Sequence, residues 1–366
     1  QHPTSVMGPL VEPAGGKLEH ALTTLEPGER WLVEPRRLDS TGRLWSPGVK
    51  EGVTPGSPFH LTEYFGPVLG IMTAPTLDDA IALQNAVPYG LTAGLFSLDA
   101  DELATWLERV EAGNLYVNRG ITGAIVRRQP FGGWKRSSVG AGTKAGGPNY
   151  LVGLSDWTSE PATRSAAPSP SVARLLDAAR SAGVDGLDRA FGSDAAAWRD
   201  EFGTVRDVSQ LGVERNVLRY LPTPVLVRHA GGPVADLLRV AGAAIAARSD
   251  AVVSTPDELP RTVAAALRAG GLRPVVEDAA AWRRRVAALD GGRIRLVGGA
   301  ASEGYDATGG RPDVAVYAQP VTEAGRIELL PFLREQAISI TAHRFGTPDH
   351  LFDGVLVETP AQSLPQ

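Results

Sequence analysis

The sequence predicts an α/β protein with two units, and three observations carry this prediction. Short runs rich in Val, Ile and Leu alternate with segments of helical periodicity over much of the chain. Residues 155–171, SDWTSEPATRSAAPSPS, are rich in Ser, Pro, Ala and Thr and have no apolar period, which is typical of a linker. The length of 366 residues is ample for two domains. We therefore expect domains at residues 1–154 and 172–366.

The first unit is expected to contain three strands separated by two helices. Thr76 is a candidate cap for the first helix, and Gly113 is a stop signal after the second. Because helices connect the three strands, the strands are expected to form a parallel sheet. In chain order the elements are strand Val68–Met72, helix Leu77–Asn85, strand Thr92–Ser97, helix Asp101–Glu111 and strand Asn114–Asn118.

The second unit repeats the alternation of helices and strands and is expected to be another α/β domain. Its expected helices are Val234–Ala247, Arg261–Ala269 and Ala279–Leu289. Its expected strands are Ala251–Ser254, Arg273–Val276, Arg293–Val297 and Val314–Tyr317.

Composition and charge argue against several classes of protein. The net charge is −5 and the pI is about 5.8, so a broad electrostatic footprint for nucleic acid is not expected. No apolar run approaches the ~20 residues of a membrane-spanning helix, and the beginning of the sequence has no signal-peptide pattern. We expect a soluble, cytoplasmic protein.

Cysteine and histidine usage limits the chemistry of the chain. With no cysteine, it offers no disulfide, no thiolate metal site and no thiol nucleophile. None of the six histidines has another histidine four residues away, which is the spacing of a helical metal site. We therefore expect neither a bound metal nor a thiol nucleophile in this chain.

The sequence EYFGPV at residues 63–68 comes at the start of the first expected strand. The carboxylate of Glu63 can hydrogen-bond a ribose, and the ring of Phe65 can stack on a flat ring. A surface loop with one packed Phe is the commoner use of such residues. The residue types alone favour that simpler interpretation.

Glycine-containing segments follow at Gly123-Ala124 and at residues 129–135, QPFGGWK. Glycine lets the backbone approach a ligand closely, and successive free N–H groups can bind an anion, although an irregular turn is the commoner arrangement. The sequence GAGTKAGG at residues 140–147 lacks the spacing of a phosphate-binding loop, and no strand leads into it. A nucleotide phosphate is therefore not expected there.

Taken together, four motifs in this order resemble the latter half of the aldehyde dehydrogenase catalytic domain. They are EYFGPV, then PYGLTAGLFS at residues 88–97, EAGNLYVN at residues 111–118 and QPFGGWKRS, which begins at Gln129. The resemblance implies that residues 1–154 form the C-terminal part of such a domain, with a strand of the kind used for oligomerisation.

Further motifs narrow the resemblance. The sequences TGAIVRRQPFGGW at residues 122–134 and KAGGPNYL at residues 144–151 are similar to glutamate-semialdehyde dehydrogenases. LEPGERWLVEPR at residues 25–36 and HLTE at residues 60–63 are similar to bacterial bifunctional proline-utilization A enzymes. Beyond the linker, NVLRYLP at residues 216–222 resembles the C-terminal domain of the longer members. Residues 172–366 are thus expected to form a second, noncatalytic aldehyde-dehydrogenase-like α/β domain.

The resemblance assigns roles to five residues. Glu63 matches the residue that binds the nicotinamide ribose, and Phe65 matches the aromatic residue beside the nicotinamide ring. Gly123 and Ala124 match the loop whose backbone N–H groups hold the α-carboxylate of the substrate. Phe131 matches the aromatic residue that packs against the aliphatic stem of the substrate.

The resemblance implies a reaction and its cofactors. The reaction is the NAD-dependent oxidation of L-glutamate γ-semialdehyde to L-glutamate in proline catabolism. FAD is implied only if a proline dehydrogenase domain is fused upstream. Besides the small-molecule substrate, the implied partner is the upstream part of the same polypeptide, and a homo-oligomer is compatible with the resemblance. No nucleic-acid partner is expected.

One departure from the family pattern concerns catalysis. The family's nucleophilic cysteine, its general-base glutamate and most of its NAD-binding domain precede the region where Gln1 falls. Without a thiolate no thiohemiacetal can form, so this chain alone is expected to be inactive.

Two rival hypotheses are left open by the sequence. One is a noncatalytic structural or interaction protein that stands alone, which a start codon near Gln1 would support. The other is an aldehyde dehydrogenase for a different aldehyde, which depends on whether Gly123 and Ala124 bind a carboxylate. A cysteine encoded several tens of residues upstream would favour the fragment hypothesis over the first of these.

The sequence at residues 326–346, RIELLPFLREQAISITAHRFG, also resembles the longer proline-utilization A enzymes. Its apolar positions mix helical and alternating spacings, which predicts a helix followed by a short strand. In the longer relatives the similar segment covers a cavity through which the product of proline oxidation is channelled. We therefore expect it to pack on the first domain as a lid, with Arg334 and Glu335 in polar contacts at its margin.

Overall fold

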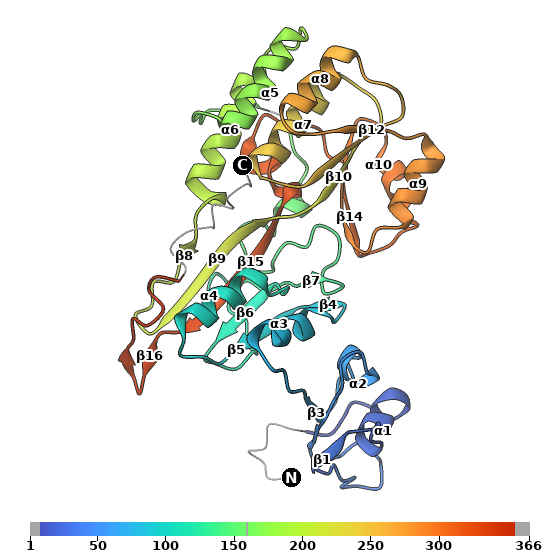
Figure 1. The fold of residues 1–366 in the computed structure, drawn as a ribbon, viewed down its shortest axis with the longest axis vertical. Helices are drawn as coiled ribbons and strands as arrows, with labels where there is room; N and C mark the ends of the chain where they lie inside the picture. Colours follow the sequence, from blue (N-terminus) through green and yellow to red (C-terminus); the bar gives the residue numbers. More distant parts are fainter. Residues whose placement is uncertain (1–7, 159, 356–366) are drawn as a thin grey trace. The chain divides into compact units, whose positions relative to one another are not determined.

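The computed structural model describes residues 8–158 and 160–355. The chain divides into two compact units. The first contains the described residues up to Pro88 together with Thr105–Glu111, and the second contains Tyr89–Ala104 and the described residues from Ala112 onward. The α/β class predicted from the sequence is confirmed by this structure (Figure 1).

The first unit is organised around a three-stranded sheet in the order β1-β2-β3, in which β2 pairs antiparallel with β1 and parallel with β3. Helix α3 begins at the Thr76 cap expected from the sequence, because the Thr76 side chain accepts a hydrogen bond from the Asp79 N–H. Its elements are α1 Gly16–Thr23, β1 Arg30–Val33, β2 Gly48–Glu51, α2 Pro58–Leu61, β3 Val68–Ile71 and α3 Leu77–Asn85.

The second unit contains a five-stranded sheet in the order β5-β6-β15-β9-β8. Strand β15 pairs in parallel with β6 and antiparallel with β9, so segments far apart in sequence lie side by side (Figure 1). Helix α4, Ala100–Arg109, precedes β6. The strands are β5 Thr92–Leu95, β6 Asn114–Val117, β8 Arg206–Asp207, β9 Glu214–Pro222 and β15 Leu333–Thr341.

The expectation that three early strands share one parallel sheet is therefore wrong in part. Strands β5 and β6 are parallel neighbours, but β3 pairs with β2 in a different sheet. Periodicity identifies a strand and does not identify its neighbour, because pairing depends on contacts between residues distant in the chain. The short strand β2 has no strong strand pattern in the sequence and was not expected.

A second five-stranded sheet is entirely parallel, in the order β12-β11-β10-β13-β14. The predicted strands at residues 251–254, 273–276, 293–297 and 314–317 and the predicted helices at residues 234–247, 261–269 and 279–289 are confirmed to within two residues at each end, whereas the central strand of this sheet and its last helix were not expected. The strands are β10 Val225–His229, β11 Ala251–Thr255, β12 Pro274–Val276, β13 Gly292–Val297 and β14 Val314–Tyr317. The helices are α7 Val234–Ala246, α8 Arg261–Ala269, α9 Ala279–Ala287 and α10 Ala301–Thr308.

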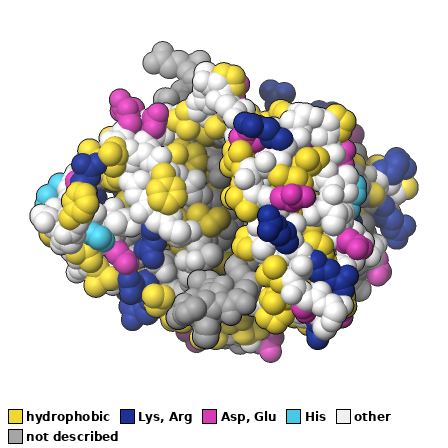
Figure 2. Space-filling view, turned by 90° about the horizontal axis from the view of Figure 1, so that it is seen from below, with side chains coloured by type: hydrophobic (Ala, Val, Ile, Leu, Met, Phe, Trp, Pro, Cys, Tyr) yellow, Lys and Arg dark blue, Asp and Glu magenta, His cyan; other side chains and the backbone are white. Residues whose placement is uncertain are grey.

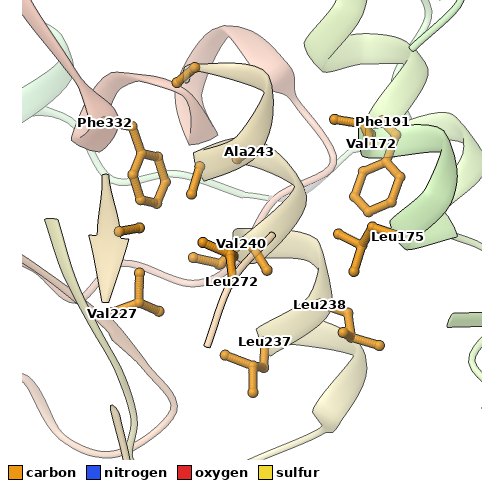
Figure 3. Packing of buried hydrophobic residues seen from close by; sticks show 14 of the residues in the cluster. Val172, Leu175, Phe191, Val227, Leu237, Leu238, Val240, Ala243, Leu272 and Phe332 are labelled. Atoms are coloured by element: carbon orange, nitrogen blue, oxygen red, sulfur yellow. The ribbon is translucent and has the colours of Figure 1, made fainter. Parts of the chain in front are cut away.

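Both faces of this parallel sheet are covered, as parallel sheets require. Successive residues of β10 point to opposite faces. Val227 packs in a core with α7 and α5, Pro170–Ser181, which Figure 3 shows, whereas Leu226 packs with Trp282 of α9. The apolar character of adjacent β10 residues thus reflects burial on two sides.

The remaining elements are short. Helix α6, Asp188–Ala197, continues into a π-helical turn at Trp198–Phe202, and a 3₁₀ turn lies at Val152–Leu154. Strands β4 Tyr89–Gly90 and β7 Trp134–Lys135 form a two-stranded ladder, as do β16 His343–Arg344 and β17 Thr347–Pro348. Between Ser155 and Ser169, the described residues form neither helix nor strand.

The segment 326–346 has the expected order of a helix followed by a strand, but its helix is shorter and its strand longer than expected. A short helix, α11 Gly325–Glu328, and a 3₁₀ turn at Leu330–Phe332 lead into the nine-residue strand β15. The apolar spacing was mixed because β15 is buried along most of its length, between two partner strands. Glu335 is 6% exposed and lies within the fold instead of at a margin. The function of the segment as a lid stays a prediction.

Surface character is mixed. On the face drawn in Figure 2, basic and acidic side chains are interspersed among hydrophobic ones. Within the described part of the chain, the helices are too short or too polar to cross a bilayer. In the same residues, no group of three or more His, Cys, Asp or Glu side chains is arranged to hold a metal ion.

Candidate cofactor and substrate loops

The loop that carries Glu63 and Phe65 joins α2 to β3 and is fixed by α1. The Lys17 Nζ donates a hydrogen bond to the Glu63 carbonyl oxygen at 2.5 Å. A Cβ at Gly66 would lie 2.3 Å from the Leu18 Cδ1, so the loop contacts α1 closely and a larger residue at this position would require the Leu18 side chain to move. Two adjacent residues of α1 thereby set the path of the loop.

Residues on this loop alternate between packed and exposed. The Tyr64 ring stacks on the Phe59 ring, with centroids 4.9 Å apart and planes 25° apart. Glu63 and Phe65 on either side are exposed, and Phe65 is 87% exposed with φ +53°. A left-handed conformation costs a non-glycine residue about 1–3 kcal/mol and is concentrated at functional sites. The structure thus presents a carboxylate and an aromatic ring together on one strained loop.

A buried amine supports the Phe59 ring and was not identified from the sequence. Lys50 is 2% exposed, and its Nζ binds the Glu29 Oε2 at 2.9 Å and the Thr24 carbonyl oxygen at 3.0 Å. The same Nζ lies 4.4 Å from the Phe59 ring centroid, which is a cation–π distance. A single lysine gives no signal of burial in the sequence, because its partner Glu29 is 21 residues away.

The loop that carries Gly123 and Ala124 follows β6 in the second unit. The Tyr116 hydroxyl donates to the Gly123 carbonyl oxygen at 2.7 Å, and Gly123 has φ +96°. Both residues are exposed. Among the described residues, no acceptor takes up the backbone N–H of either one. Two successive free N–H groups can bind a carboxylate.

Phe131 lies farther along the same loop and is held through the backbone. Its N–H donates to the Ala145 carbonyl at 3.0 Å, and its carbonyl accepts from the Ala145 N–H at 2.9 Å. The Asn114 side chain binds the flanking groups: Nδ2 donates to the Pro130 carbonyl at 3.0 Å, and Oδ1 accepts from the Gly132 N–H at 3.1 Å. The backbone at Phe131 is thus held against β6, and the Phe131 ring is half-buried.

A second buried amine, that of Lys144, binds the backbone next to Phe131. Lys144 is 1% exposed, and its Nζ donates to the Asn114 Oδ1 at 2.9 Å and to the Gly132 carbonyl. Its own backbone N–H donates to the Glu335 Oε2 at 2.9 Å. Burial lowers the pKa of the Lys144 ammonium to about 7, although the nearby Glu335 carboxyl opposes this shift. A neutral amine has two N–H groups, which match its two acceptors.

This pKa predicts how stability depends on pH. Above pH 7 the folded chain releases the Lys144 proton while the unfolded chain retains it, so the free energy of unfolding should rise with pH. From pH 7 to pH 9 the contribution should be about 2 kcal/mol. Urea unfolding at the two pH values should show this gain in the wild type and its loss in Lys144→Met. Lys17→Met, which removes an exposed amine, is the control, and an equal gain in both variants would refute the prediction.

Strands from residues 172–366 also hold the candidate substrate loop that carries Gly123, Ala124 and Phe131. The Gln129 Nε2, on a side chain only 3% exposed, donates to the Asn216 Oδ1 of β9 at 3.1 Å and to the Ser339 Oγ of β15 at 2.9 Å. Arg128 pairs with Glu214. These partners lie 87, 210 and 86 residues away, so spacing along the chain could not predict them.

The five predicted site residues therefore lie on two loops. Glu63 and Phe65 share the exposed loop of the first unit, whereas Gly123, Ala124 and Phe131 share the loop after β6 in the second. Their roles in binding stay predictions. Lys50 and Lys144, which the sequence did not single out, support the two loops from buried positions.

A family model and two similar proteins all relate this chain to aldehyde dehydrogenases. The sequence model of the aldehyde dehydrogenase family matches residues 1–158. The chain is 36% identical over 150 residues to a 1-pyrroline-5-carboxylate dehydrogenase of Geobacillus sp. (strain WCH70). The aligned region covers 41% of this chain and 29% of that protein. It is 42% identical over 114 residues to the Bacillus thuringiensis (strain Al Hakam) protein of the same name, covering 31% of this chain and 22% of that one.

A solved structure matches almost the whole chain. Proline utilization A (PutA) from Corynebacterium freiburgense has a TM-score of 0.75 and 41% sequence identity, and the match covers 94% of this chain and 32% of that one. The chain thus spans less than a third of the length of the relatives named here. It therefore carries an aldehyde dehydrogenase family domain at residues 1–158, within an α/β fold that matches part of a proline utilization A structure.

Proposed function

We propose that this chain is part of an NAD-dependent dehydrogenase that oxidises L-glutamate γ-semialdehyde to L-glutamate. The observation that carries the proposal is the pair of exposed, unpaired backbone N–H groups at Gly123 and Ala124, which the described residues leave without an acceptor. The names of the relatives support it, because 1-pyrroline-5-carboxylate is the cyclic form of this semialdehyde.

The substrate would be held at its carboxylate end and along its short aliphatic chain. Its α-carboxylate would accept hydrogen bonds from the N–H groups of Gly123 and Ala124, and charge-assisted bonds of this kind contribute about 1.5–3 kcal/mol each. The half-buried Phe131 ring would pack against the methylene groups. Lys144 and Asn114, which bind the peptide groups beside Phe131, would orient the ring.

The residues of the Glu63–Gly66 loop fit a nicotinamide cofactor. The exposed carboxylate of Glu63 can accept hydrogen bonds from ribose hydroxyls, and the exposed ring of Phe65 offers a flat apolar face. When bound, NAD supplies the acceptor for the hydride that leaves the substrate. The strained φ of Phe65 supports a binding role, because an exposed ring has no packing reason to adopt it.

We further propose that the nucleophilic cysteine and most of the NAD-binding domain belong to another part of a longer polypeptide. The small share of each relative that this chain covers supports that arrangement. An FAD-dependent proline dehydrogenase would be present only if it were fused upstream. In this arrangement residues 172–366 are noncatalytic.

The test is to compare this chain with the longer protein. The longer protein should reduce NAD⁺ steadily in the presence of glutamate semialdehyde, and this chain should not, because it has no cysteine. NADH formation is followed by absorbance at equal protein concentrations. Steady turnover by this chain alone would contradict the proposed division of the active site.

In the longer protein, Glu63→Ala and Phe65→Ala should weaken cofactor use more than substrate use. The loss of a carboxylate–ribose hydrogen bond should raise the KM for NAD⁺ by ~10-fold. Initial rates measured separately against NAD⁺ and against aldehyde distinguish the two effects. Glu12→Ala and Phe96→Ala, which remove an exposed carboxylate and an exposed ring elsewhere, are matched controls. The assignment fails if the KM for NAD⁺ is unchanged in both loop variants.

A further inference from the structure

A cavity of about 480 Å³ lies within the second unit, between two stretches that are distant in sequence. One wall comes from residues 126–130 and 146–151, and the other from residues 201–208 together with β9. Its volume is within the range of small-molecule sites, about 300–1,000 Å³. Gly123, Ala124 and Phe131 do not line it.

The walls of this cavity are mostly apolar. They include Val126, Pro130, Leu151, Val208 and Leu218, with the ring of Tyr150. Apolar walls with a few polar groups are typical of pockets that bind organic molecules. An apolar body in the ligand would therefore be favoured, because its burial removes apolar surface from water.

Two guanidinium groups on the lining are available to an anion. Arg127 and Arg206 are both exposed, and within the described chain neither forms a salt bridge. Arg127 has φ +66°, and its backbone N–H donates to the Gly146 carbonyl at 3.2 Å. The backbone at Arg127 is thus held in a conformation that is costly for a non-glycine residue.

The acidic group of the lining is already neutralised. Glu201 Oε2 lies 2.6 Å from the Arg326 Nε, and the Arg326 guanidinium lies 5.2 Å from the centroid of the Phe202 ring. Nearby Asp200 binds Arg199 through two hydrogen bonds of 2.7 and 3.0 Å. Burial raises the pKa of the Tyr220 phenol, so this lining residue stays an uncharged hydroxyl. The unpaired charge on the lining is therefore positive.

We propose that this cavity is a binding site for an amphipathic organic anion, with an aromatic or branched apolar body and one anionic head. The body would occupy the apolar walls, and the head would lie between Arg127 and Arg206. The unpaired charges of Arg127 and Arg206 favour an anionic head, and the apolar lining favours a ligand more apolar than a free amino acid. This inference does not depend on the proposed dehydrogenase function.

The test uses the 366-residue chain and anilinonaphthalene sulfonate, a fluorescent anion with an aromatic body. We expect saturable binding at one site per chain. Val208→Trp should weaken this binding because the indole would occupy part of the cavity, and the risk to folding is small because Val208 is 50% exposed. Val276→Trp is the matched control, since Val276 is 52% exposed and does not line the cavity.

The role of the charges is tested with Arg127→Gln/Arg206→Gln. This variant should raise the Kd of the sulfonate by ~5- to 20-fold, since each exposed charge pair contributes up to about a fivefold effect. Phenylnaphthylamine, which lacks the sulfonate, should bind it as it binds the wild type. Arg268→Gln/Arg283→Gln removes two other exposed arginines and should leave both probes unaffected.

Three results would overturn the proposal. The first is sulfonate binding that is as tight in Val208→Trp as in the wild type, the second is several sites of equal affinity, and the third is an equal loss of both probes in the double arginine variant. Thermal unfolding of each variant, followed by circular dichroism, shows whether it is folded. A double arginine variant that unfolds is replaced by the two single variants, each of which should show part of the loss.

Discussion

A chain that ends at Gly325 should lose the cooperative unfolding of its second compact unit. The deletion removes β15, which lies between β6 and β9 and pairs with both. Leu333, Ile338 and Ile340 of this strand are each no more than 3% exposed. Burial of three such side chains contributes roughly 5 kcal/mol or more, which is comparable to the total stability of many domains.

The deletion also leaves a buried charge without its partner. Arg295 and Glu328 are both 0% exposed, with the Arg295 Nε 2.7 Å from the Glu328 Oε1. Removing one member of a buried pair typically costs about 3–5 kcal/mol. Circular dichroism during heating should therefore show no sharp transition for this unit, or one lowered by more than ~10 °C.

The control for this deletion is a chain that ends at Val355, which keeps β15 and the residues that flank it. It should unfold as the intact chain does. If the chain ending at Gly325 instead melts at the temperature of the control, β15 is not a required strand of the sheet. That result would favour a loosely attached lid at residues 326–346.

In the longer protein, Ala124→Leu should lower the kcat/KM for glutamate semialdehyde by roughly 100-fold. The larger side chain would displace the substrate carboxylate from the N–H groups of Gly123 and Ala124, which have no other acceptor among the described residues. An uncharged aldehyde with the same number of carbon atoms should be oxidised at nearly the wild-type rate, because it makes no bond to this loop.

The informative quantity is the ratio of the two kcat/KM values. Ala280→Leu, which makes the same substitution at an exposed position of α9, should leave the ratio unchanged. Equal losses for the charged and uncharged aldehydes in Ala124→Leu would indicate general misfolding and remove the anchor role of the loop. An unchanged ratio with full activity would place the carboxylate elsewhere.

Local pattern was sufficient for many individual elements of this protein, although strands such as β1, β2 and β10 were not expected. Helix α8 and strand β14 have the bounds that the sequence predicted, and Thr76 caps α3 as expected. Periodicity, helix caps and helix breakers act over a few residues, so they can be recognised in the sequence without tertiary information. The order of short motifs along the chain likewise indicated the aldehyde dehydrogenase family, because a motif depends only on the identity of neighbouring residues.

Only the tertiary structure decided which strands are neighbours and what holds the candidate loops. Strand β15 pairs with β6 across more than two hundred residues, and Gln129 binds Ser339 over the same range. Lys144 is buried because Asn114 and Glu335 meet it from different strands. Such contacts bring together residues that are far apart in the chain, and no local periodicity in the sequence identifies these partners. The sequence by itself determined the motifs and many of the elements, whereas long-range pairing determined the sheet and the support of its loops.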